Sequence, residues 1–174
     1  PVELCRRNVG RHFVVSETRR VVVSSLTLSA AVGIFALSFG VASVSAGASV
    51  WQTCALSLFV FTGASQFSAM SVVGAGGSML AAYGGAVLLA ARNLVYGLAL
   101  SSSAKSVAGN LPRRLFAAHF VIDETTALAL AESSPKLRKI AFWTTGIGLF
   151  SFWNLGTLIG ALAGSAIDPQ KFGL

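Results

Sequence analysis

The feature that most constrains this 174-residue sequence is a long stretch without any charged side chain. No Asp, Glu, Lys or Arg occurs between Arg20 and Arg92, so residues 21–91 are uncharged. Charged residues make up 11% of the chain, whereas a typical soluble domain carries about 25% to cover its water-facing surface. The composition is also too apolar for an intrinsically disordered chain. We therefore expect an all-α, polytopic integral membrane helical bundle, because helices satisfy their backbone groups within lipid.

Turn-forming residues divide the sequence into apolar segments that we expect to be membrane helices. Glycine-rich stretches separate the first three segments, and Ser-, Asn- and Pro-containing loops separate the later ones. The five expected segments are 21–43, 50–72, 79–100, 115–131 and 140–166. Residues 1–20 form a basic tail that precedes a transmembrane domain, residues 21–174.

The basic residues bear on the orientation of these segments. Five arginines precede residue 21, which predicts a cytoplasmic N-terminus. Three simple crossings would then place the basic loop 101–114 outside, against the positive-inside rule. A re-entrant hairpin within residues 62–85 would reverse that loop but would expose the basic loop 132–139 instead, and the sequence leaves both topologies open. Because the basic residues flank apolar segments, the net charge of +7 does not predict nucleic-acid binding.

Ionisable side chains inside the fourth segment are the first functional candidates. His119 and Asp123 are four residues apart, which would place them on one helix face, with Glu124 adjacent. A carboxylate at the bilayer centre costs about 2.5–3.5 kcal/mol unless it is protonated, paired or hydrated. The available cation is Arg92 in the third segment. We interpret these four residues as a proton-coupling group. A structural salt bridge that locks the bundle, or an Arg92 that snorkels to the interface, is the alternative.

A second polar cluster lies in the middle of the second segment, where small residues and an amide follow one another. These residues would allow close helix packing, or a helix broken here would free backbone groups to bind the carboxylate and ammonium of a zwitterion. The spacing does not decide between the two. The cluster consists of Gly63, Ala64, Ser65, Gln66 and Phe67.

The fifth segment combines a polar residue with a stripe of glycines. Asn154 is polar and lies well inside the segment. Gly156, Gly160 and Gly164 follow at four-residue spacing, which predicts a helix-packing surface. The sequence contains no His-Glu-x-x-His, Gly-x-Ser-x-Gly or phosphate-binding Gly-Lys-Ser/Thr motif, and its Cys and His residues lack metal-ligand spacing. We therefore predict no enzymatic activity, cofactor or metal.

Four motifs, in order, resemble the AzlC family, the large subunits of bacterial branched-chain amino acid exporters. They are FTGASQF at 61–67, ARNLVYGL at 91–98, HFVIDET at 119–125 and WNLGT at 153–157, and the resemblance extends from about residue 19 to the end. It implies proton-driven export of valine, leucine, isoleucine and methionine across the bacterial inner membrane, together with a small hydrophobic AzlD-type partner subunit. It also implies that the chain is part of a longer protein, since family members continue past the stretch matching 167–169 with further helices.

On this resemblance and the intramembrane polarity, we expect the substrate site to comprise Gly63–Phe67, Asn93, Tyr96 and Asn154. Asn93 stands where the family often has His directly after Arg, which favours hydrogen bonding to substrate over a proton role. The alternative function is a non-transporting membrane scaffold or accessory subunit, in which Arg92 and Asp123 form a structural lock.

Overall fold

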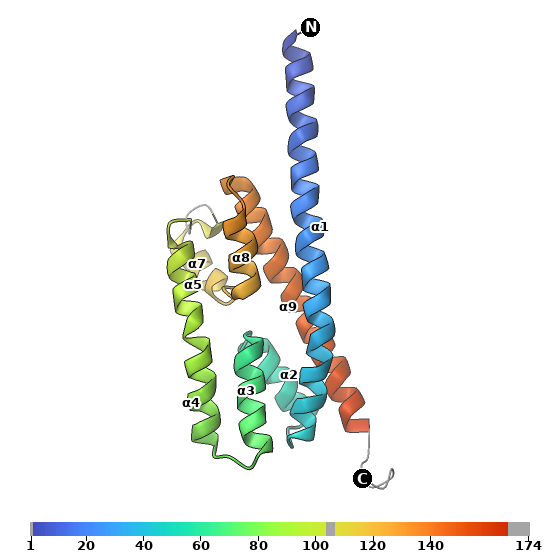
Figure 1. Ribbon diagram of the computed structural model, residues 1–174, viewed down its shortest axis with the longest axis vertical. Helices are drawn as coiled ribbons and strands as arrows, with labels where there is room; N and C mark the ends of the chain where they lie inside the picture. The colour runs from blue at the N-terminus through green and yellow to red at the C-terminus, as the bar shows by residue number, and fades with distance from the viewer. Residues whose placement is uncertain (1, 104–106, 167–174) are drawn as a thin grey trace.

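Two long helices lie against each other and shorter helices pack beside them (Figure 1). The computed structural model describes residues 2–103 and 107–166, with side chains from residue 15 onward. All regular secondary structure in this described part is α-helical, which confirms the predicted class. The long helices are α1 (Val2–Ser45) and α9 (Pro135–Ala166). The predicted loop residue Lys105 and the Asp168–Pro169 end of the fifth segment lie outside the described residues.

Glycines on α9 allow close contact with α1. A Cβ atom at Gly160 would overlap the Leu37 carbonyl of α1, and one at Gly164 would lie 3.2 Å from Val41 Cα. Gly156 meets α1 in the same way. The glycine stripe of the fifth segment therefore faces α1, where small residues let two backbones approach within a membrane.

The expected second segment, 50–72, is not a single helix. It consists of α2 (Val50–Phe59) and α3 (Gly63–Gly74), which are separated by residues 60–62. Val60 (φ −113°, ψ 66°) and Thr62 (φ −152°, ψ 96°) leave the helical region, and β-branched residues favour such a departure. The hairpin begins and ends at the same end of the molecule, because a Cβ atom at Gly74 would lie 3.0 Å from Ala46 Cβ at the end of α1.

The third segment agrees with the prediction. Helices α4 (Met79–Ala90) and α5 (Arg92–Ser101) join at Ala91, whose dihedral angles stay helical, and together form one apolar stretch of 23 residues. The other two stretches long and apolar enough to cross a membrane are Val15–Ser45 and Pro135–Ala166. These three stretches are the only such spans in the part of the chain that the structure describes.

The expected fourth segment is also broken, into α7 (Leu111–Ala118) and α8 (Asp123–Ala131). The prediction that His119 and Asp123 share one helix face is therefore wrong, since residues 119–122 interrupt the helix. Thr125 replaces the missing helical hydrogen bonds: its hydroxyl accepts from the Ile122 N–H at 3.1 Å and donates to the Phe120 carbonyl at 2.6 Å. Hydrophobic periodicity does not predict that a side-chain hydroxyl takes the place of these backbone hydrogen bonds.

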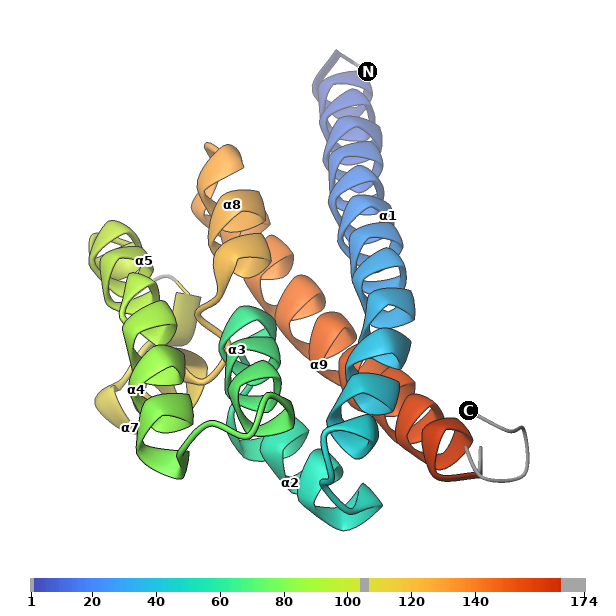
Figure 2. The ribbon, with the colours of Figure 1, turned by 60° about the horizontal axis from the view of Figure 1, so that its bottom comes forward.

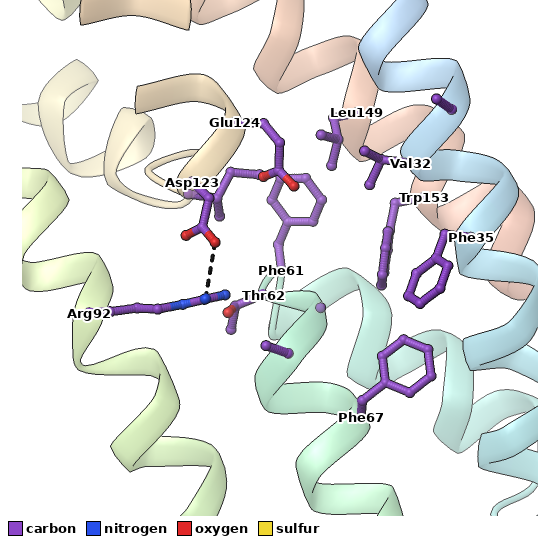
Figure 3. A pocket seen from close by; sticks show the side chains of 14 residues that line it. Val32, Phe35, Phe61, Thr62, Phe67, Arg92, Asp123, Glu124, Leu149 and Trp153 are labelled. Carbon is purple, nitrogen blue, oxygen red and sulfur yellow. Dashed lines mark ion pairs between the residues drawn. The ribbon is translucent and has the colours of Figure 1, made fainter. Parts of the chain in front are cut away.

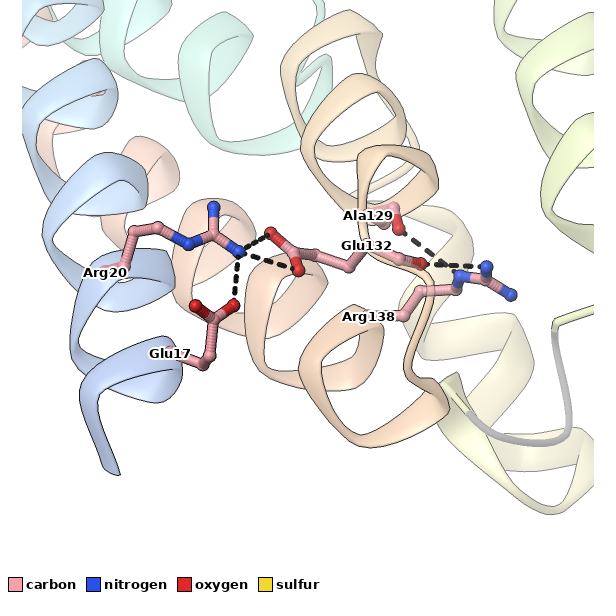
Figure 4. A network of polar contacts seen from close by, with 5 residues as sticks. All are labelled: Glu17, Arg20, Ala129, Glu132 and Arg138. Atoms are coloured by element: carbon pink, nitrogen blue, oxygen red, sulfur yellow. Dashed lines mark hydrogen bonds and ion pairs between the residues drawn. The ribbon is translucent and has the colours of Figure 1, made fainter. Parts of the chain in front are cut away.

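Because the chain contains two hairpins, its N-terminal stretch, the end of α5 and the α8–α9 turn all lie at one end (Figure 1). Arg20 on α1 pairs with Glu132 after α8 at 2.9 Å, and Arg138 on α9 donates to Ser103 Oγ after α5 at 2.6 Å. Figure 4 shows how Arg138 also reaches the Ala129 and Glu132 carbonyls. With the second hairpin, the basic turn after α8 lies at the same end of the molecule as the end of α5, whereas a single hairpin would leave the two at opposite ends.

Candidate functional site

A cavity of about 550 Å³ lies where the two hairpins meet α1, α5 and α9. This volume is within the range of about 300–1,000 Å³ that small-molecule sites occupy. The walls come from residues far apart in sequence and from both hairpin tips, 60–62 and 119–122. The lining residues are Ala31, Val32, Phe35, Phe61, Thr62, Gly63, Ala64, Phe67, Arg92, Ile122, Asp123, Glu124, Leu149 and Trp153.

The N-termini of two half-helices border this cavity. Helix α3 begins at Gly63 and α8 begins at Asp123, and both residues line the cavity. The first turn of any helix leaves backbone N–H groups without intrahelical partners, and its dipole favours negative charge there. Thr62 makes no capping hydrogen bond to the first turn of α3. Broken helices of this kind are how membrane transporters place backbone groups at a substrate.

Arg92 and Asp123 form an ion pair at the edge of the cavity. Arg92 Nη1 lies 3.0 Å from Asp123 Oδ2, and the two side chains are 39% and 41% exposed. Asp123 Oδ1 and Arg92 Nε are buried atoms with no hydrogen-bond partner in the described structure. The pair therefore keeps unused hydrogen-bonding capacity beside the cavity. Arg92 pairs with one of the two carboxylates that the sequence suggested.

Glu124 faces the same cavity without a matching cation. Its side chain is half-buried, and among the described residues no Lys or Arg lies within ion-pairing distance of its carboxylate. Figure 3 shows Glu124 pointing from α8 toward the space beside Phe61. The two adjacent carboxylates are thus electrostatically different, since one is neutralised by Arg92 and the other is not.

The cavity has a charged side and an aromatic side. In Figure 3 the Arg92–Asp123 pair lies on the α5 and α8 side, with Thr62 near it. Trp153 and Phe35 lie on the opposite side, toward α1 and α9. A zwitterion with an apolar substituent has the same division of polarity.

The polar cluster of the second segment divides between the cavity and the protein interior. Gly63, Ala64 and Phe67 line the cavity, whereas Ser65 and Gln66 are almost completely buried and are not among its lining residues. Gln66 Nε2 donates to the Leu56 and Val60 carbonyls at the end of α2. Gln66 Oε1 accepts from Trp153 Nε1 at 3.0 Å. Gln66 therefore stabilises the break between α2 and α3 by hydrogen bonds to the protein itself.

The remaining predicted substrate residues do not line the cavity. Tyr96 lies close enough to Asp123 to interact with its carboxylate. Asn93 Oδ1 is buried and has no hydrogen-bond partner in the described structure. Asn154 Nδ2 donates to the Phe150 carbonyl one turn earlier in its own helix, at 2.8 Å. Tyr96 is thus the member of this set placed next to the ion pair.

His119 connects the tips of the two hairpins. Its ring stacks on Phe61 with a centroid separation of 5.8 Å and meets Phe150 edge-on at 5.7 Å. The helix break at residues 119–122 separates His119 from Asp123, with which the sequence predicts a shared helix face. Within the described residues, no group of three His, Cys, Asp or Glu side chains could hold a metal ion.

Sequence reasoning did not find the apolar walls of the cavity. Trp153 and Phe35 were indistinguishable from ordinary packing residues in so apolar a chain. Trp153 did carry one usable signal, because a buried indole N–H needs a hydrogen-bond acceptor. Gln66 was the nearby amide that could supply it.

Fold and site together define a class: a helical membrane protein in which two broken hairpins meet at a central charged cavity. Residues 27–167 match the family model described as AzlC protein. The chain belongs to the AzlC family, a membrane protein family generally linked to transport.

Two similar proteins are both described as uncharacterized membrane proteins. An uncharacterized membrane protein of Helicobacter pylori strain 26695 is 31% identical over 139 residues, and its counterpart in strain J99 is 30% identical over 138 residues. Each match covers 77% of this chain and 59% of the relative, so the chain spans about three-fifths of their length. No solved structure matches the chain.

Proposed function

We propose that this chain forms the substrate-binding core of a proton-coupled exporter of branched-chain amino acids and methionine. The observation that carries the proposal is the cavity, in which an ion pair and two half-helix N-termini face an aromatic wall. Such a site matches the polar and apolar parts of these substrates at once. The motif resemblance names the substrate class.

In the proposed binding mode, the substrate lies with its charged groups toward Arg92 and its side chain toward Trp153. Its carboxylate accepts hydrogen bonds from Arg92 and from the N–H groups of the first turn of α3. Its ammonium group is held by Glu124, the carboxylate without an ion pair. Phe35 and Phe67 complete the apolar contact with the side chain.

We further propose that the two carboxylates have separate roles in proton coupling. Asp123 holds Arg92, whose guanidinium lies 3.0 Å from its carboxylate. Glu124 has no such partner among the described residues, and an isolated carboxylate in low-dielectric surroundings is stabilised by binding a proton or a cationic substrate. Proton binding and ammonium binding at Glu124 would then exclude each other, which couples the two movements.

The proposal includes a place in the cell and a partner. The basic ends of α1, α7 and α9 lie at one end of the molecule, and the positive-inside rule assigns that end to the cytoplasm of a bacterial inner membrane. The family resemblance adds a small AzlD-type subunit. The activity of the complete protein therefore has to be measured with and without that subunit.

Efflux of radiolabelled valine and leucine from cells that express the full-length protein tests this function. We expect Glu124→Gln to reduce gradient-driven efflux by about tenfold or more, because coupling is lost. Exchange of internal for external substrate should continue with a raised KM, because the amide oxygen accepts a hydrogen bond from the ammonium group but carries no charge. Asp123→Asn should reduce both gradient-driven efflux and exchange, since it leaves Arg92 without its partner.

Glu132→Gln is the matched control, because that carboxylate lies at the end of the molecule, away from the cavity, and pairs with Arg20. It should retain efflux. Normal efflux in both Glu124→Gln and Asp123→Asn would refute proton coupling at this site, and absence of amino acid transport in the wild type would refute the function itself.

The Arg92–Asp123 pair also supports a second candidate, a non-transporting scaffold in which this pair only locks α5 to α8. A lock requires opposite charges at the two positions but not their order. The charge reversal described below separates the two candidates.

A further inference from the structure

Trp153 forms the wall of the cavity that faces the charged groups. Its side chain is 4% exposed, and its ring stands edge-on between Phe61 and Phe35 in the view of Figure 3. On its outer side the ring packs against Phe39 of α1, with the centroids 6.3 Å apart and the planes 24° from parallel. The indole therefore cannot move away from the cavity without displacing α1.

A hydrogen bond from the first hairpin fixes the position of this ring. Trp153 Nε1 donates to Gln66 Oε1 at 3.0 Å, and both groups are buried. The Gln66 amide nitrogen is itself held by the Leu56 and Val60 carbonyls. The tip of the α2–α3 hairpin and the wall of the cavity are thus joined through one amide.

Gly63 is what allows the ring to lie against the start of α3. A Cβ atom at this position would lie 2.7 Å from Trp153 Cη2 and 3.1 Å from Cζ2. Any larger residue would therefore push the ring. Because Phe39 lies behind the ring and the Gln66 hydrogen bond holds its Nε1, we expect a displaced ring to move toward the cavity.

We propose that Trp153 determines which apolar side chains the exporter accepts, by setting the depth of the aromatic end of the cavity. Gln66 is its positioning residue and Gly63 gives it room. The inference rests on the proposed function, since it concerns the substrate of that same cavity. One methylene group in an apolar pocket changes specificity by about 10- to 200-fold, so a wall of indole size has a large effect.

Competition between substrates in proteoliposomes tests this assignment. The full-length protein with its co-expressed small subunit is reconstituted, and kcat/KM is measured for valine, leucine and phenylalanine. Trp153→Phe deepens the pocket and should raise the phenylalanine-to-valine ratio by about tenfold. Gly63→Ala pushes the indole inward and should lower the leucine-to-valine ratio by a similar factor.

Trp143→Phe is the matched control, since this second tryptophan of α9 lies outside the cavity lining and donates its Nε1–H to the Val107 carbonyl at 2.8 Å. It should leave both ratios unchanged. Gln66→Ala frees the indole and should shift the phenylalanine-to-valine ratio in the same direction as Trp153→Phe. In the Trp153→Phe background it should add nothing, because the hydrogen bond is already gone. If Trp153 had a purely structural role, its replacement would lower kcat/KM equally for all substrates.

The outcomes separate this inference from the function on which it rests. A wild-type protein that transports no amino acid refutes the proposed function. A wild-type protein that transports valine, with ratios in Trp153→Phe equal to those in Trp143→Phe, overturns the assignment of Trp153. If Trp153→Phe does not fold, unchanged ratios in Gly63→Ala and Gln66→Ala overturn it in the same way.

Discussion

The α2–α3 and α7–α8 hairpins each consist of two short helices separated by a non-helical tip, and they differ in the side chains at these tips. Residues 50–74 contain no charged side chain, whereas residues 111–131 contain two arginines, a histidine and two carboxylates. The break at 60–62 is closed by Gln66 together with Trp153 from α9. The break at 119–122 is closed by Thr125 from within the hairpin.

This difference gives the two helix N-termini opposite chemistry. The first turn of α3 offers uncapped N–H groups to the cavity, whereas the first turn of α8 carries Asp123 and Glu124. A carboxylate at a helix N-terminus gains about 0.3–1 kcal/mol from the dipole, which offsets part of the cost of burying it. One tip therefore presents positive partial charge and the other presents negative charge, a short distance apart, with Arg92 between them.

Reversing the ion pair is the strongest test of that asymmetry. In the variant Arg92→Asp with Asp123→Arg, opposite charges remain paired, but the start of α8 loses its net negative side-chain charge, because the new arginine offsets Glu124. If the order of charges matters, we expect a folded protein with efflux reduced by about 100-fold, equivalent to about 2.7 kcal/mol. Size-exclusion chromatography in detergent reports folding, and radiolabelled valine efflux reports function.

The control is the same reversal at Arg20 and Glu132, a pair outside the cavity. It should keep efflux near the wild-type level. Full efflux in the Arg92/Asp123 reversal would mean that the pair is only a lock, in which the order of the two charges does not matter.

The sequence predicts the class of fold because the uncharged stretch 21–91 allows little else. It does not predict where the helices break. Hydrophobic periodicity continues through Val60 and Val121, and the groups that replace the lost helical bonds, Gln66 and Thr125, are recognisable only once the chain is folded. The re-entrant hairpin that the sequence left open within residues 62–85 differs from the hairpin of the structure, which spans residues 50–74. A second hairpin, which the sequence did not predict, places the next basic turn at the same end.

The charged residues of the candidate site were predictable, because few charged residues occur in the apolar segments. Arg92 is the only Lys or Arg within the apolar segments, so pairing with Asp123 or Glu124 was predictable, and the choice of Asp123 comes from the structure. The roles of the amide side chains were harder to predict, because an amide can form hydrogen bonds either with a ligand or with the protein itself. Gln66 and Asn154 both bond to backbone carbonyls, and that distinction depends on tertiary contacts.

Replacing Gln66 tests how far the first hairpin depends on its neighbour. Gln66→Leu keeps the side chain's size but leaves the Val60 carbonyl and the Trp153 N–H without this partner. We expect the free energy of unfolding to fall by about 2–3 kcal/mol, the effect of leaving the buried Trp153 N–H unsatisfied, while the Val60 carbonyl still accepts from the Thr62 N–H at 2.7 Å. Thermal unfolding in detergent measures it. Gln52→Leu, at an exposed capping position on α2, should lower stability by no more than about 1 kcal/mol. Equal losses would show that the buried amide contributes nothing beyond a surface cap.

Replacing Thr125 tests whether the second hairpin closes its break by itself, and we expect the smallest effect here. Thr125→Val removes the hydroxyl that bonds to Phe120 and Ile122, and should lower the free energy of unfolding by about 1–2 kcal/mol. The adjacent Thr126 is buried too, yet its hydroxyl has no hydrogen-bond partner in the described structure. Thr126→Val should therefore be neutral or stabilising in the same thermal unfolding measurement, because it removes an unpaired polar group from the interior. If both substitutions are neutral, the break at 119–122 is held by its aromatic contacts with Phe61, and the second hairpin depends on the first.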